Sequence, residues 1–79
     1  GAEIDLVFIK NGRMYGIECK RVDAPQLTPS MRIALEDLSL SQVAVIYPGV
    51  QRYELGEKIA AVPFEEVENG MKGLFRMKN

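Results

Sequence analysis

Two apolar runs joined by Asn-Gly constrain the fold of this chain more than any other feature. Hydrophobic residues alternate with other types along residues 4–8 and again along 15–19, and Asn11-Gly12 lies between the two runs. The pattern is typical of a β-hairpin with a two-residue type I′ turn, because Asn and Gly tolerate the positive φ angles of that turn. In such a hairpin Lys10 pairs with Arg13, and the register of every earlier pair follows from it.

The predicted register divides the hairpin side chains between two faces, because opposite residues in a sheet share a face. One face is apolar, is expected to be the core side, and carries Ile4, Leu6, Phe8, Tyr15, Ile17 and Cys19. Cys19 is therefore expected to be a small buried hydrophobe. The other face carries three facing pairs: Val7 with Gly16, Asp5 with Glu18, and Glu3 with Lys20.

Two carboxylates directly opposite each other, Asp5 and Glu18, are the unusual part of this register. Such a pair is unfavourable unless a cation lies between the two groups, either a divalent metal ion or the ammonium of Lys20 on the diagonal. Mg²⁺ is commonly held by one or two carboxylates with waters and phosphate oxygens, so the pair predicts a small oxygen-lined site. The alternative is an ordinary solvated hairpin face on which Lys20 neutralises Glu3 and Asp5.

A helix and three further strands are expected after the hairpin. Thr28-Pro29 is an N-cap followed by proline at the first helical position, and the apolar stripe that follows predicts a helix ending near Ser39. The apolar run 43–47 suits a central strand covered on both faces, and a crossover through the helix makes it parallel to the second hairpin strand. Segments 53–55 and 59–62 are expected to be short strands and 64–71 a helix, which gives one α/β domain with a small mixed sheet over residues 1–71. The polar tail 72–79 is expected to fray.

Composition narrows the functional classes. The chain has 79 residues, a single cysteine and no histidine, which argues against an internal disulfide and a zinc site and leaves metals that bind oxygen. Ten basic against eleven acidic residues give a net charge of −1, so no global positive field attracts nucleic acid. The longest apolar run is too short to cross a membrane and no signal peptide is evident, so a cytoplasmic location is expected.

Asp5 on the first hairpin strand and Glu18-Cys19-Lys20 on the second resemble the second and third motifs of the PD-(D/E)XK, or restriction-endonuclease-like, superfamily. More narrowly, the segments GAEIDLVF, YGIECKR, LTPSMRIALEDL and VAVIYPG look like the C-terminal domain of unknown function appended to a family of prokaryotic AAA-type ATPases. The resemblance implies a nuclease-like α/β core in which Asp5 and Glu18 bind Mg²⁺, the backbone oxygen of Cys19 also contacts it, and Lys20 assists the attacking water. The resemblance also implies Glu3 as an extra acidic member, and the implied reaction is metal-assisted phosphodiester hydrolysis.

The chain departs from this pattern in what precedes Asp5. The helix and first strand that superfamily members carry there are not in the sequence, nor is an ATPase module with its Walker loop. We therefore expect a part of a longer protein, with the ATPase module as its partner, weak nucleic-acid binding, and an open sheet edge that favours self-association. Two functions stay open: a nuclease-like domain active only in the intact protein, and a catalytically silent interaction or regulatory module of the ATPase.

Overall fold

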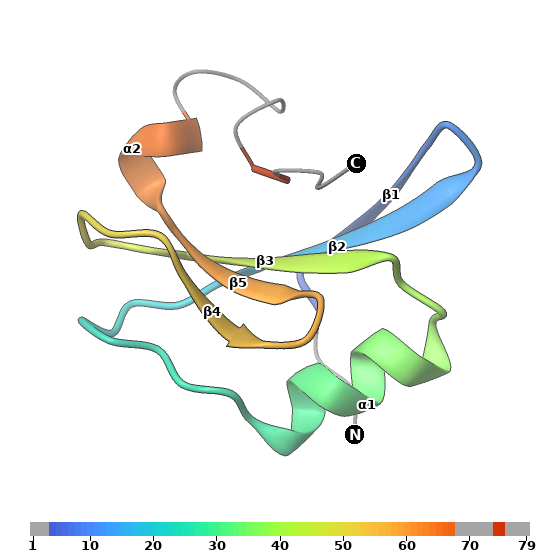
Figure 1. Cartoon of the computed structure of the whole chain (residues 1–79), viewed down its shortest axis with the longest axis horizontal. Coiled ribbons are helices and arrows are strands. Elements are labelled where there is room, and N and C mark those ends of the chain that lie inside the picture. The colour runs from blue at the N-terminus through green and yellow to red at the C-terminus, as the bar shows by residue number, and fades with distance from the viewer. Residues whose placement is uncertain (1–3, 68–73, 76–79) are drawn as a thin grey trace.

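A five-stranded mixed sheet forms the centre of the computed structural model, which describes residues 4–67 and 74–75. Its elements are β1 (Leu6–Lys10), β2 (Arg13–Cys19), α1 (Pro29–Asp37), β3 (Gln42–Tyr47), β4 (Tyr53–Gly56), β5 (Ile59–Pro63) and α2 (Phe64–Val67). The strand order is β1-β2-β3-β5-β4, with β3 parallel to both of its neighbours and the outer pairs antiparallel. Helix α1 lies on one side of the sheet, and α2 lies on the other (Figure 1). The predicted fold class is confirmed.

The turn between β1 and β2 has the geometry that the sequence predicts. Asn11 and Gly12 have φ angles of 52° and 75°, the positive values of a type I′ turn. The register runs from the Lys10–Arg13 pair to the Leu6–Ile17 pair, as the two-residue turn requires. The local sequence therefore sets the pairing of the hairpin from the turn to the Leu6–Ile17 pair.

Helix α1 begins where its capping signal lies. The hydroxyl of Thr28 accepts a hydrogen bond from the backbone N–H of Met31 at 3.3 Å, and Pro29 is the first helical residue. Met31 and Ala34 are fully buried against the sheet, while Leu38, the C-cap residue, is 40% exposed. The helix connects β2 to β3, which lie parallel.

Strand β3 is the central strand, as its continuous apolar run predicts. Residues 43–47 are all buried. Val43 and Val45 pack in the cluster that α1 covers, whereas Ala44 and Ile46 pack in a second cluster on the opposite face. The core is therefore divided into two layers by the sheet. No helix among residues 4–67 and 74–75 is long and apolar enough to cross a membrane.

The expectation that the hairpin has one core face and one open face is wrong, because both faces are covered. The N–H of Asp5 donates to the carbonyl of Ile17 at 3.1 Å, although Ile17 already pairs with Leu6. Two residues of the first strand thus oppose one of the second, in the manner of a β-bulge, which changes the alternation of side chains. Ile4 consequently packs on the α1 side, and Leu6 is 53% exposed.

The C-terminal segment supplies part of the second layer. Leu74 is buried, and the ring of Phe75 lies 4.8 Å from that of Tyr15 and 5.6 Å from that of Phe8. These two residues are packed, although they belong to the tail expected to fray. The remainder of that tail, and residues 68–71 of the predicted second helix, lie outside the described residues. The domain boundary at residue 71 stays a prediction.

Candidate metal site at the end of the hairpin

Glu18 is a buried carboxylate near the end of β2. It pairs in register with Val45 of β3, and so lies on the α1 side of the sheet with an exposure of 3%. An ionised carboxylate in such an apolar layer costs free energy unless a cation or hydrogen bonds compensate it. The ammonium of Lys20 lies close to this carboxylate, with Nζ 3.9 Å from Oε1 of Glu18.

Lys20 is held one position beyond β2 by the neighbouring strand. Its backbone N–H donates to the carbonyl of Ile46 at 2.8 Å, which continues the parallel pairing past Cys19. Alternate residues of a strand share a face, so this pairing places Lys20 on the same side as Glu18. The Lys20 side chain is 34% exposed, compared with 5% for that of Glu18. The ammonium thus lies between the buried carboxylate and solvent.

Asp5 reaches the same end of the hairpin by a different contact from the predicted one. The regular ladder ends at the Leu6–Ile17 pair, so Asp5 is not opposite Glu18 in it. Its Oδ2 instead accepts a hydrogen bond from the backbone N–H of Cys19 at 2.8 Å. The bulge at Asp5 explains the difference, because it turns the residue toward the end of β2. The Asp5 carboxylate therefore lies beside the peptide that joins Glu18 to Cys19.

Cys19 contributes its backbone to this arrangement. A strand residue directs its N–H and C=O to the same neighbour, so the Cys19 carbonyl, like its N–H, points to the β1 side. Its side chain is exposed, which corrects the expectation of a buried hydrophobe. The regular ladder, and with it the apolar face, ends before Cys19 because of the bulge. Glu3, the further acidic member in the prediction, lies outside the described residues.

The donor chemistry of this end of the hairpin suits a hard cation. Asp5 and Glu18 offer carboxylate oxygens and Cys19 a carbonyl oxygen, the ligand types that Mg²⁺ takes, with waters completing its octahedron. Across residues 4–67 and 74–75, no group of three or more His, Cys, Asp or Glu side chains is placed to hold a metal ion. A site here would thus depend on two side chains, one backbone oxygen and solvent.

A pair of tyrosines that the sequence did not single out fixes the loop after Lys20. The Tyr53 hydroxyl donates to the carbonyl of Pro25 at 2.7 Å, and its ring meets that of Tyr47 edge to face at 5.7 Å. Desolvation raises the pKa of Tyr53 above its ordinary value of 10.0, and the neighbouring Tyr47 adds to the effect. These contacts join residues distant in sequence, so no local pattern announces them.

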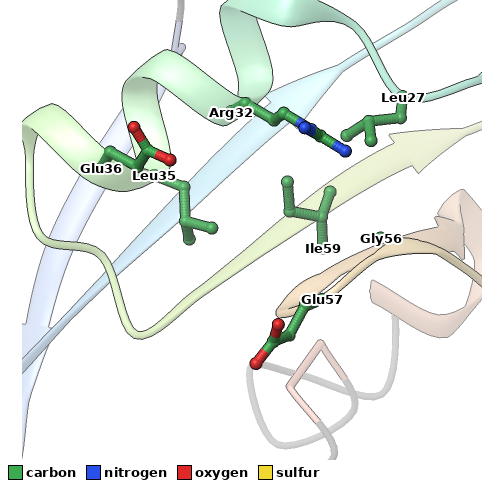
Figure 2. A pocket seen from close by; sticks show the side chains of 7 residues that line it. All are labelled: Leu27, Arg32, Leu35, Glu36, Gly56, Glu57 and Ile59. Atoms are coloured by element: carbon green, nitrogen blue, oxygen red, sulfur yellow. The ribbon is translucent and has the colours of Figure 1, made fainter.

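A hollow of about 270 Å³ lies elsewhere on the α1 side of the sheet. It is lined by Leu27, Arg32, Leu35, Glu36, Gly56, Glu57 and Ile59. Figure 2 shows aliphatic side chains in its middle, the Arg32 side chain extended toward Leu27, and the two carboxylates at its borders. Neither Asp5, Glu18 nor Lys20 belongs to it, so it is distinct from the candidate metal site.

Comparison with known proteins gives a family without an assigned activity. A family model described as "Domain of unknown function (DUF4143)" matches residues 1–67. The chain is also similar to two uncharacterised proteins, Rv2008c of Mycobacterium tuberculosis and Mb2031c of Mycobacterium bovis, each 44% identical over 66 residues. That alignment covers 84% of this chain and 15% of each relative, so the chain spans a small part of their length. No solved structure matches. The chain belongs to the DUF4143 family.

Proposed function

We propose that this domain is the nuclease-like module of a longer prokaryotic ATPase and that it binds Mg²⁺ at the end of the β1–β2 hairpin. One observation carries the proposal: the Asp5 carboxylate accepts a hydrogen bond from the Cys19 N–H, and the Lys20 ammonium lies beside the Glu18 carboxylate. The resemblance to the PD-(D/E)XK pattern rests on these residues, and the hydrogen bonds and burial support their close grouping.

In this proposal each residue has a separate task. Asp5 and Glu18 hold the ion with their carboxylates, and Cys19 contributes its backbone oxygen. Bound Mg²⁺ supplies Lewis acidity, which stabilises negative charge on a phosphodiester and favours hydroxide over water. Lys20, whose side chain is 34% exposed, would orient the attacking water.

Nucleic acid would reach this site only with help from other parts of the longer protein. The chain carries a net charge of −1, whereas affinity for a phosphate backbone comes mainly from Lys and Arg. Because the chain covers only 15% of its relatives' length, most of each relative lies outside the domain. We therefore propose that the ATPase part brings the substrate, and that the isolated chain has little nuclease activity.

Titration with Mg²⁺ tests the metal site directly. In ¹⁵N-labelled 79-residue chain, the backbone amides of residues 5, 6 and 18–20 should shift with saturating behaviour at millimolar Mg²⁺, while those of β4 stay unchanged. Asp5→Asn and Glu18→Gln should each weaken the response, and Glu54→Gln, which neutralises an exposed carboxylate on β4, should not. Shifts of equal size in all three variants would indicate general ionic strength effects and would contradict the site.

A second function, a catalytically silent interaction or regulatory module, is favoured by the burial of Glu18. A carboxylate that is 3% exposed and lies near a lysine is also the arrangement of a structural ion pair. In that case Mg²⁺ causes no site-specific shifts, and substitution of Lys20 alters stability alone. The same titration separates the two functions.

A further inference from the structure

The segment 21–27, which leads from Lys20 toward helix α1, crosses the end of the sheet and is anchored on β4. Pro25 in its middle is buried, whereas the residues on either side of it are exposed. The Pro25 carbonyl accepts a hydrogen bond from the Tyr53 hydroxyl at 2.7 Å. In the sheet order β3 and β5 lie between β2, where the segment begins, and β4, which carries Tyr53. The segment therefore reaches across the width of two strands before the helix starts.

Tyr53 lies in the same row of the sheet as the buried carboxylate of the candidate site. The registers pair Glu18 with Val45, Val45 with Ala61, and Ala61 with Tyr53. Opposite residues in a sheet share a face, so the side chains of Glu18 and Tyr53 are both on the α1 side. The hydrogen bond to the segment 21–27 is thus made on the face that carries the site.

Tyr47 stands between Lys20 and Tyr53 on this face. The Lys20 N–H donates to the carbonyl of Ile46, so the parallel pairing continues and places Lys20 opposite Tyr47. Tyr47 is buried, and its ring meets the Tyr53 ring edge to face at 5.7 Å. Its hydroxyl donates to the carbonyl of Gln51 and accepts a hydrogen bond from the Gln51 N–H. Because β5 separates β3 from β4, these contacts hold the Tyr47 ring toward β4 and away from β2.

We propose that Tyr53 is a positioning residue of the candidate site, which keeps the Lys20 ammonium beside the Glu18 carboxylate. Its hydroxyl holds Pro25 and so fixes the direction in which the chain leaves Lys20, and its ring holds Tyr47, the neighbour of Lys20 on β3. A lysine side chain has many rotamers, so a fixed backbone and a fixed neighbour favour the conformers that approach the carboxylate. The consequence for catalysis rests on the proposed function, in which Lys20 orients water, whereas the positioning itself does not.

The coupling between Glu18 and Lys20 tests the proposal without any metal. A double-mutant cycle with Glu18→Gln and Lys20→Met is measured in the unsubstituted chain and again in Tyr53→Phe, which keeps the ring and removes the hydroxyl. The coupling free energy should fall to less than about half in the Tyr53→Phe background. A merely structural role would lower the stability of all four chains alike and leave the coupling unchanged, which would overturn the proposal. Tyr15→Phe is the control, since it removes a tyrosine hydroxyl from the opposite face and should leave the coupling unchanged.

A spectroscopic measurement keeps the proposal testable where the variants are too unstable for the cycle. The ¹³C relaxation of the Lys20 Cε methylene should show greater mobility in Tyr53→Phe than in the unsubstituted chain, while that of the exposed Lys10 stays the same. Equal mobility of the Lys20 methylene in both chains would contradict the positioning role.

The Mg²⁺ titration keeps the two proposals apart. If the coupling depends on Tyr53 and Mg²⁺ causes no site-specific shifts, the positioning role stands and the metal site fails. If Mg²⁺ causes the expected shifts and the coupling is the same with and without the Tyr53 hydroxyl, the metal site stands and the positioning role fails.

Discussion

Replacement of Lys20 by methionine should destabilise the fold, because it removes the cation that faces a buried carboxylate. The Nζ–Oε1 separation of 3.9 Å corresponds to about 4 kcal/mol at an effective dielectric constant of about 20. The Lys20 side chain is 34% exposed, so solvent screening reduces this to roughly 2 kcal/mol. Methionine keeps most of the aliphatic stem, so little packing is lost.

A double-mutant cycle separates this electrostatic effect from other consequences of the substitution. Glu18→Gln removes the buried charge with almost no change of shape, and the chain with both substitutions should regain most of the stability lost in Lys20→Met alone. Lys10→Met is the matched control, since it makes the same chemical change on the exposed part of β1 and should cost less than about 0.5 kcal/mol.

Urea denaturation followed by circular dichroism gives the free energies of unfolding. The measurement is made at low protein concentration so that self-association does not contribute. If Lys20→Met were no more destabilising than Lys10→Met, or if the effects of the two site substitutions simply added, the ion pair would have no measurable role in stability.

Two further predictions concern contacts far from the hairpin. The raised pKa of Tyr53 means that the folded state holds the phenolic proton more tightly than the unfolded state, so its contribution to stability is full below pH 10.0 and is lost as the pH rises through the raised value. The difference in unfolding free energy between the unsubstituted chain and Tyr53→Phe should therefore diminish at high pH, and a pH-independent difference would argue against this. Gly49→Ala should destabilise by more than about 2 kcal/mol, because a Cβ there would lie 2.0 Å from the Tyr47 ring; a thermal melt unchanged from that of the parent chain would contradict the contact.

The elements that were predicted well are those whose signals are local. Asn11-Gly12 determines the turn and the register of β1 with β2, and Thr28-Pro29 determines the start of α1. The continuous apolar run of β3 correctly indicates a strand buried on both faces. Each of these features depends on neighbouring residues, so the sequence pattern contains the information.

The details of the candidate site were harder to predict because they depend on distant parts of the chain. The alternation of apolar and charged residues along the hairpin suggested that one face is exposed to solvent. In the structure, α1 covers the face that carries Glu18, and Leu74 with Phe75 covers part of the other face. The bulge at Asp5 is also not evident from the local sequence. It moves Asp5 to the Cys19 N–H and Ile4 to the α1 side. The hairpin register predicted that Asp5, Glu18 and Lys20 lie at the same end of the hairpin, whereas it did not predict their burial and contacts. Their role as a site stays a prediction.

The attachment of Leu74 bears on where this domain ends. The Arg52 guanidinium donates to the Leu74 carbonyl at 3.1 Å and lies 3.5 Å from a Glu66 oxygen. Arg52, which directly precedes β4, therefore links α2 to the segment that contains Leu74. The family match stops at residue 67, before the two side chains that shield Phe8 and Tyr15. A chain cut at that limit would expose an aromatic surface to water and would tend to aggregate. The aggregation would result from the shortening rather than from a defect of the fold itself.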